Sequence, residues 1–217
     1  MMDRIEMLKK TNYYFITDSR SSVSTLDQVK IAVESGVKMI QYRDKSKSDR
    51  EKYDDLIKIN KICGEKSLLI VNDRVDLALS TKADGVHLGQ DDLPPKKVKK
   101  LSEDLILGIS THNKNQAKKA EKIADYVALG PLFETDTKKN PDPELGIKRA
   151  CRIAESIEVP TVAIGGIGKK DIPEIIGPFD IICAVSSVTR SGNISKNVED
   201  FEKEINIFKE GKNGKTF

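Results

Sequence analysis

The sequence predicts a single (β/α)8 barrel of the α/β class, and three observations lead to this fold. Short apolar runs rich in strand-forming residues recur eight times along the chain. They are almost continuously apolar, as strands covered on both faces of a parallel sheet are. Amphipathic segments separate them, and 217 residues allow about 27 residues for each strand and helix unit, compact but within the range of this barrel. Doubly wound sheets commonly have only about five or six strands.

Each predicted strand is a short run that ends at or beside a polar residue or a glycine. In chain order the runs are Tyr13–Thr17, Lys38–Arg43, Leu68–Asn72, Gly85–Leu88, Leu105–Ser110, Tyr126–Gly130, Thr161–Gly166 and Ile181–Ser186. Because parallel strands all end at the same edge of a sheet, these polar ends are expected to face one another across the barrel mouth.

The predicted helices are recognised by their first residues and by their apolar faces. Thr25 and Gln28 match a capping box for the first of them, which we expect to end at Gly36. Ser48 and Glu51 match the same motif for the second. Apolar residues at helical spacing mark buried faces: Leu26, Val29, Ala32 and Val33; Ala150, Ile153, Ala154 and Ile157; Val198, Phe201, Ile205 and Phe208.

Charge and hydropathy exclude several classes of function. The chain has 37 Lys and Arg against 34 Asp and Glu, a net charge of +3, and the two signs are interleaved. No broad positive face for nucleic acid is therefore expected. The apolar runs are too short to cross a bilayer, and the first residues do not form a signal peptide, so a cytoplasmic location is expected. We expect one domain over residues 1–217 with a flexible tail from about Gly211 to Phe217.

The end of the second predicted strand carries three polar residues that share one face. Gln41, Arg43 and Lys45 alternate along the chain, so their side chains point the same way and can converge on one ligand. An arginine and a lysine without an adjacent counter-charge on that face indicate an anion such as phosphate. Solvated charges at a strand end are the alternative.

Two aspartates follow the third and fourth predicted strands. Asp73 and Asp92 would meet over the barrel mouth because neighbouring strands lie about 4.8 Å apart. Two carboxylates together with phosphate oxygens and water are typical of a Mg²⁺ site. Each aspartate could instead cap the helix that follows it.

The last two strands end in residues suited to bind phosphate through the backbone. Gly165 and Gly166 follow the seventh strand, and Ser186 and Ser187 follow the eighth, where barrels of this class often hold phosphate. A Gly-Gly pair could also be no more than a turn. His87 is expected either to line the barrel as a hydrogen-bonded residue or to act in catalysis, and the role of His112 stays open.

Taken in order, these motifs resemble thiamine phosphate synthases. They are Gln-x-Arg-x-Lys, Asn-Asp-Arg, Asp-Gly-Val-His-Leu-Gly-Gln-x-Asp, Gly-x-Ser-Thr-His, Gly-Pro-x-Phe-x-Thr-x-Thr-Lys, Ala-Ile-Gly-Gly-Ile and Val-Ser-Ser. The resemblance implies an enzyme, a transferase that joins 4-amino-2-methyl-5-(diphosphooxymethyl)pyrimidine to thiazole phosphate, releases pyrophosphate and yields thiamine monophosphate. It also implies Mg²⁺ as the cofactor and two small-molecule partners, and it leaves open whether the protein is a homo-oligomer.

The resemblance assigns roles to particular residues. The pyrimidine diphosphate is assigned to Gln41, Tyr42, Arg43, Asp44, Lys45, Asn72, Ser110 and Lys138. The thiazole phosphate is assigned to Thr135, Asp136, Thr137, Gly166, Val185 and Ser186, and Mg²⁺ to Asp73 and Asp92. Arg43, Lys45, Ser110 and Lys138 are the expected catalytic residues, with Lys138 carried on a loop that covers the diphosphate.

Two other functions remain open at the level of sequence. Phe133-Glu134-Thr135 is similar to the related thiazole tautomerases, and Glu134 stands where many synthases have proline. A tautomerase has no use for a diphosphate and metal site, so the intact Arg43, Lys45 and aspartate pair favour the synthase. A non-catalytic sensor of phosphate ligands would use the same pockets.

Overall fold

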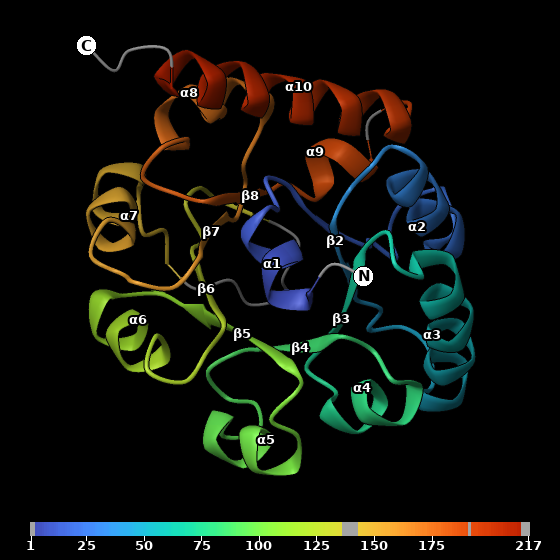
Figure 1. The fold of residues 1–217 in the computed structure, drawn as a ribbon. Helices are drawn as coiled ribbons and strands as arrows, with labels where there is room; N and C mark the ends of the chain where they lie inside the picture. Colours follow the sequence, from blue (N-terminus) through green and yellow to red (C-terminus); the bar gives the residue numbers. More distant parts are fainter. Residues whose placement is uncertain (1–2, 136–142, 191, 214–217) are drawn as a thin grey trace.

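The computed structural model describes residues 3–135, 143–190 and 192–213 and confirms the predicted barrel. Its eight strands are all parallel and pair in chain order from β1 to β8. A parallel bridge between Tyr13 and Ile182 joins the two ends of the sheet. Figure 1 looks along the barrel and shows the helices arranged around the ring of strands.

The elements follow the predicted alternation of strand and helix. The strands are β1 Tyr14–Ile16, β2 Met39–Tyr42, β3 Leu68–Asn72, β4 Gly85–Leu88, β5 Ile106–Thr111, β6 Tyr126–Leu129, β7 Thr161–Ile164 and β8 Ile181–Cys183. The helices are α1 Arg4–Lys9, α2 Thr25–Glu34, α3 Asp49–Cys63, α4 Val75–Thr81, α5 Pro95–Leu101, α6 Lys114–Ala120, α7 Ile147–Ala154, α8 Ile172–Ile175, α9 Ser186–Thr189 and α10 Ile194–Asn213, with a 3-10 turn at Lys169–Asp171.

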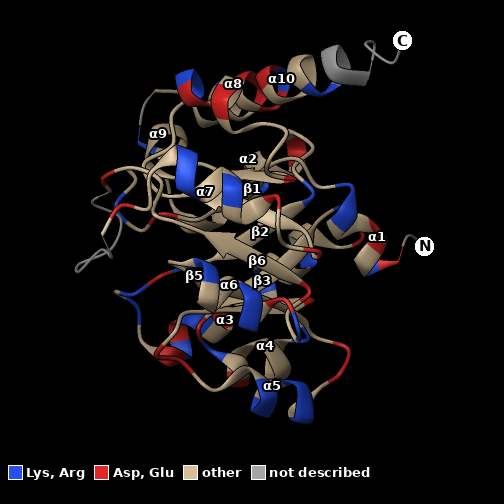
Figure 2. Ribbon diagram, turned by 90° about the vertical axis from the view of Figure 1, so that its left-hand side faces the viewer, with Lys and Arg blue, Asp and Glu red and all other residues tan. Residues whose placement is uncertain are grey.

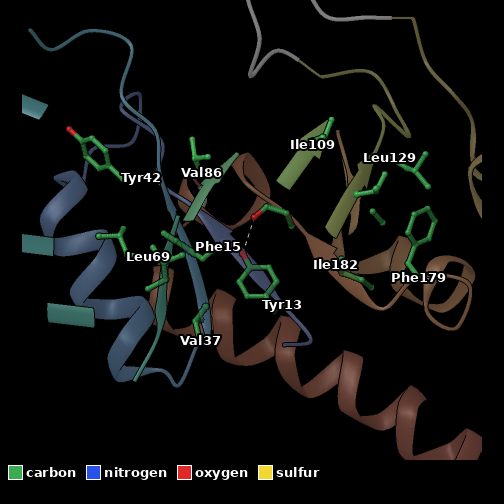
Figure 3. Close-up of a cluster of buried hydrophobic side chains, with 14 of the residues drawn as sticks. Tyr13, Phe15, Val37, Tyr42, Leu69, Val86, Ile109, Leu129, Phe179 and Ile182 are labelled. Atoms are coloured by element: carbon green, nitrogen blue, oxygen red, sulfur yellow. Dashed lines mark hydrogen bonds between the residues drawn. The ribbon is translucent and has the colours of Figure 1, made fainter. Parts of the chain in front are cut away.

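Alternate residues of the strands form two separate apolar layers. Outward-facing side chains pack against the helices, and Figure 3 shows part of this layer, including Tyr13, Phe15 and Phe179. The Tyr13 hydroxyl donates to the carbonyl of Ala184 over 2.8 Å. This bond ties the chain just before β1 to the chain just after β8 and so helps to close the barrel.

Helix α1, which the sequence analysis did not predict, covers the N-terminal end of the barrel. Met7 and Leu8 are its buried residues, and they belong to the same cluster as the inward-facing Tyr14, Met39 and Leu68. Figure 1 shows α1 in front of the ring of strands. The interior is therefore sealed at the end opposite the strand C-termini.

The predicted capping box of α2 is wrong, and that of α3 is confirmed. Ser24 rather than Thr25 is the N-cap of α2, and its side chain accepts from the amide of Asp27. Ser48 and Glu51 cap α3 reciprocally, as predicted. Two hydroxyl residues, Ser24 and Thr25, are adjacent at the start of α2, and the first of them is the N-cap.

An aspartate directly before β4, β6 and β8 ties each of these strands to the preceding one. The carboxylates of Asp84, Asp125 and Asp180 accept the backbone N–H of Leu69, Leu107 and Thr161 over 2.8, 2.7 and 2.8 Å. These bonds satisfy amides at the strand ends, where no ladder partner remains. They fix the register from which the functional loops at the other end leave the barrel.

Helix α10 continues to Asn213, which places its end within the segment for which a flexible tail was expected. Val198, Phe201 and Ile205 on this helix are buried and Phe208 packs against the same core, as their spacing predicted. Figure 2 shows both signs of charge along α10, whereas α5, α6 and α7 carry basic residues and no acidic ones. Within the described ranges no helix combines the length and apolarity of a membrane span.

Candidate active site

A pocket opens at the C-terminal ends of the strands and brings together half of the residues assigned to the site. Residues from β1, β2, β3, β4, β5, β7 and β8 and from the segments after β2, β6, β7 and β8 line it. Its walls are Ile16, Gln41, Arg43, Asn72, His87, Ser110, Thr135, Ile164, Gly165, Gly166, Ile167, Cys183, Val185 and Ser186. Residues assigned to the two different substrates thus share one cavity.

The cationic side of the pocket is formed by the end of β2. Arg43 follows this strand, and its amide donates to the Thr17 hydroxyl over 2.8 Å, which anchors the chain there. Burial lowers the pKa of Arg43, while the negative charges of Asp73 and Asp18 oppose that shift. Lys45 is more exposed, with Nζ 3.5 Å from Asp73 Oδ2. Both cations therefore lie near the predicted metal ligand.

Tyr42, Asp44 and Lys45 do not line this pocket; with Asn72 and Asp73 they line a second one, which shares Asn72 with the first. Tyr42 and Asp44 alternate with Gln41 and Arg43 along the chain, and the buried Tyr42 hydroxyl donates to Asp55 on α3 over 3.0 Å. Asp44 accepts from the amide and hydroxyl of Ser46 and so shapes the turn that follows β2. Any contact of these two residues with the pyrimidine diphosphate stays a prediction.

Asp73 and Asp92 come together, and neither caps a helix. The residues at the starts of α4 and α5 are Arg74 and Pro94. Asp92 instead accepts from the Gly89 amide over 2.7 Å, and Asp73 adopts a positive φ of 61°. Burial raises the pKa of Asp92, and the negative charge of the neighbouring Asp73 raises it further.

This carboxylate pair fits Mg²⁺. Two hard oxygen ligands of like charge repel each other, which the raised pKa of Asp92 reflects, and a divalent cation would relieve the repulsion. Among the described residues no group of three or more His, Cys, Asp or Glu is placed to hold a metal ion. Such a site would be completed by substrate oxygens and water, as is usual for Mg²⁺.

The loops after β7 and β8 form the other side of the pocket. Gly165 and Gly166 have φ of 100° and 67°. A Cβ on Gly166 would lie 2.4 Å from the carbonyl oxygen of Glu134, so packing alone already requires glycine there. The Ser187 hydroxyl donates to the carbonyl of Ile167 over 2.9 Å and joins the two loops. Ser186 and Val185 line the pocket beside them.

The two histidines have different surroundings. His87, inside the barrel, bonds through Nε2 to the Ser110 hydroxyl over 2.8 Å and through Nδ1 to the Tyr126 hydroxyl over 3.0 Å. His112 bonds through Nδ1 to the carbonyl of Gly130 over 2.6 Å and so holds the loops after β5 and β6 together. His87 thus contacts a predicted site residue.

An ion pair at the end of β1 was missed by the sequence analysis. The Asp18 carboxylate is almost fully buried and accepts from Arg190 Nε over 2.6 Å. The two residues are 172 positions apart in the chain, and no local motif marks either of them. Their pairing links the loop after β1 to the loop after α9, next to the pocket.

Asp136, Thr137 and Lys138 lie outside the described residues. Their assigned contacts, and the loop that would carry Lys138 over the diphosphate, stay predictions. Thr135, the last described residue before them, lines the pocket.

Comparisons of this chain with known proteins find similarity to one family of enzymes. A family model described as thiamine monophosphate synthase matches residues 13–188. A thiamine-phosphate synthase of Methanosarcina barkeri is 41% identical over 90% of each chain. One of Caldicellulosiruptor bescii is 44% identical over 85% of this chain and 86% of its own. The solved structure of a thiamine phosphate pyrophosphorylase from Pyrococcus furiosus superposes with a TM-score of 0.85 and 35% identity, covering 93% of this chain and 98% of that one.

Proposed function

This chain belongs to the thiamine monophosphate synthase family, and from that premise we propose how its pocket performs the reaction. The protein is a transferase that joins the pyrimidine methyl diphosphate to thiazole phosphate and releases pyrophosphate. The observation that carries the proposal is the single cavity lined both by Arg43, which follows β2, and by the glycine loop after β7. Two anionic substrates need two separate anion-binding walls.

Gln41, Arg43, Asn72 and Ser110 are proposed to hold the pyrimidine diphosphate. Arg43 is partly buried, and a charge-assisted hydrogen bond to a phosphate oxygen is strong in such surroundings. Lys45 adds a second positive charge at the solvent side. The assigned contact of Lys138 is part of the same proposal.

Asp73 and Asp92 are proposed to hold Mg²⁺. When bound, the ion would supply positive charge to the diphosphate oxygens. The Gly89 amide fixes one carboxylate, and Lys45 lies beside the other, so both side chains are oriented before any ligand arrives. A cation held by these preoriented carboxylates would stabilise the negative charge that develops on the leaving group.

The thiazole phosphate is proposed to bind to the loops after β7 and β8. Gly166, Val185 and Ser186 offer backbone amides and a hydroxyl at the pocket wall. This places the thiazole ring between its own phosphate site and the methylene carbon of the pyrimidine. Positioning of the two reactants side by side then contributes much of the rate.

The coupling needs no protein base. We propose that the bond from the methylene carbon to the diphosphate oxygen breaks first, and that the electron pair leaves with pyrophosphate. The lone pair of the thiazole nitrogen then forms the new carbon–nitrogen bond, and no proton is transferred. Arg43 and Lys45 stabilise the departing charge, whereas the electron-rich aminopyrimidine stabilises the cation.

The proposal is tested by mixing both substrates with Mg²⁺ and measuring pyrophosphate and coupled product. Equal amounts of both are expected, and EDTA should stop their formation. Asp73→Asn should lower the rate on the order of 10²-fold, whereas Asp91→Asn, which changes an exposed carboxylate next to Asp92, should not. Isomerisation of the thiazole without pyrophosphate would instead identify a tautomerase, and full activity of Asp73→Asn would reject the metal site.

A further inference from the structure

Five polar side chains form one continuous hydrogen-bonded chain across the barrel interior. Gln41 Nε2 donates to the Tyr14 hydroxyl over 2.6 Å, and the Tyr14 and Tyr126 hydroxyls lie 2.9 Å apart. Tyr126 is 3.0 Å from His87 Nδ1, and His87 Nε2 is 2.8 Å from the Ser110 hydroxyl. The five residues come from β2, β1, β6, β4 and β5. Both ends of the chain, Gln41 and Ser110, line the pocket.

The direction in which hydrogen bonds are donated along this chain follows from Gln41, its first member. An amide nitrogen can only donate, so Tyr14 accepts from Gln41 and directs its own proton to Tyr126. Tyr126 then directs its proton to His87 Nδ1, which must be the unprotonated ring nitrogen. His87 therefore carries its proton on Nε2 and donates a hydrogen bond to Ser110. Burial raises the pKa of both tyrosines, so both hydroxyls keep the protons that this direction requires.

The barrel is built to admit this chain. Gly108 is paired with Tyr126 in the sheet, and a Cβ at residue 108 would lie 2.0 Å from Tyr126 Cζ and 2.3 Å from its hydroxyl oxygen. The Tyr126 ring thus crosses the interior through the space that the glycine leaves. It stacks on His87 and meets Tyr14 edge-on, with ring centres 5.6 and 5.8 Å apart.

We propose that Tyr14, Tyr126 and His87 are positioning residues that set the hydrogen-bonding direction of Gln41 and Ser110 in the pocket. Ser110 accepts a hydrogen bond from His87, so its own hydroxyl proton is available to the ligand. The Gln41 side chain turns its amide nitrogen to Tyr14 and so offers its Oε1 to a ligand in the pocket. One end of the chain is therefore a donor to the ligand and the other end an acceptor.

This pattern deepens the proposed function and rests on it. A ligand that carries an N–H donor and a separate oxygen or ring-nitrogen acceptor matches the two ends, and an aminopyrimidine diphosphate carries both. A pyrimidine with a carbonyl in place of the amino group would place an acceptor against the Gln41 carbonyl. The chain would therefore select the amino form, because two acceptors facing each other are left unpaired.

The test begins with the ring nitrogens of ligand-free protein, observed by ¹⁵N NMR at a pH of about 8, where an ordinary histidine is neutral. His87 should be protonated at Nε2, and His112, whose Nδ1 faces a carbonyl, should be protonated at Nδ1. The protein contains 2 histidines, so each serves as the control for the other. Protonation of His87 at Nδ1 would overturn the direction of the chain.

The second arm compares two buried tyrosines. Tyr126→Phe breaks the chain in its middle, and kcat/KM for the pyrimidine diphosphate should fall about tenfold, as expected for one lost hydrogen bond. The KM for thiazole phosphate should stay unchanged. Tyr13→Phe removes an equally buried hydroxyl outside the chain and should leave both constants and the His87 spectrum as they are.

Equal kinetics for both variants would overturn the positioning role. Tyr14→Phe, which interrupts the chain next to Gln41, gives an independent check and should resemble Tyr126→Phe. The NMR measurement needs no turnover, so a protein that formed no coupled product would disprove the proposed function without deciding the direction of the chain.

Discussion

Single residues decide where charge collects at the mouth of this barrel. Asp18 is the clearest example outside the pocket, because its carboxylate is nearly inaccessible and meets Arg190. Burial alone would raise the pKa of Asp18, but hydrogen bonds from Arg190 and from the Arg20 amide, together with both guanidinium charges, lower it. The folded state therefore holds this carboxylate ionised more firmly than the unfolded chain does.

A pH-dependent contribution to stability follows. A carboxyl group with a lowered pKa stabilises the fold above its ordinary value of about 4, and the contribution is lost as pH falls through the lower, folded value. Asp18→Asn should reduce the free energy of unfolding at pH 7 by on the order of 2 kcal/mol, and the difference from the unaltered protein should shrink below about pH 4. Urea unfolding at several pH values measures it. A difference that does not change with pH would contradict the assignment.

The same scale shows what sequence could and could not predict about the site. Gln41, Arg43 and Lys45 were predicted to converge because alternation along a strand is a local rule. Gln41 and Arg43 line the pocket, whereas Lys45 lines the second one. Tyr14 and Tyr126 were missed because tyrosines inside apolar runs are typical of a core. The Tyr126 hydroxyl meets His87, and the Tyr14 hydroxyl meets that of Tyr126, only through the closure of the barrel, which no local pattern contains.

At the scale of elements, the strands were predictable because runs buried on both faces are nearly free of charge. Several predicted ends were too long, since Gly165 and Gly166 continue β7 in the sequence but adopt left-handed conformations that end the strand. Helix α1 was missed because it has six residues and only Met7 and Leu8 are buried, too few for a recognisable periodic face.

Helix α1 should nevertheless contribute to stability as a seal. Leu8, 1% exposed, fills the N-terminal end of the barrel, and Leu8→Ala should lower the free energy of unfolding by about 2–4 kcal/mol. Ile5→Ala on the same helix, where the side chain is 36% exposed, should change it by less than about 0.5 kcal/mol. Chemical denaturation of both variants decides the matter, and equal small losses would mean that α1 does not seal the core.

At the scale of the whole molecule, the barrel separates stability from function along its axis. Met7 and Leu8 close one end, while the cations, the carboxylate pair and the glycine loops occupy the other. This arrangement follows from the order of the strands. Strands that are consecutive in the sequence are also adjacent in the barrel, so the functional segments that follow them lie side by side. For this reason the motifs, taken in order along the chain, predicted a common pocket. The ion pair of Asp18 and Arg190 joins segments far apart in the sequence and could not be predicted in this way.

The central claim is that one pocket holds two anionic substrates on opposite walls, and calorimetric titration of each ligand into Arg43→Ala tests it most directly. Arg43 is proposed to supply a charge-assisted bond to the pyrimidine diphosphate alone, so affinity for that ligand should fall at least about tenfold. Affinity for thiazole phosphate should stay within about twofold, because its proposed site is on the loops after β7 and β8. A variant that lost thiazole phosphate and kept the pyrimidine diphosphate would contradict the account.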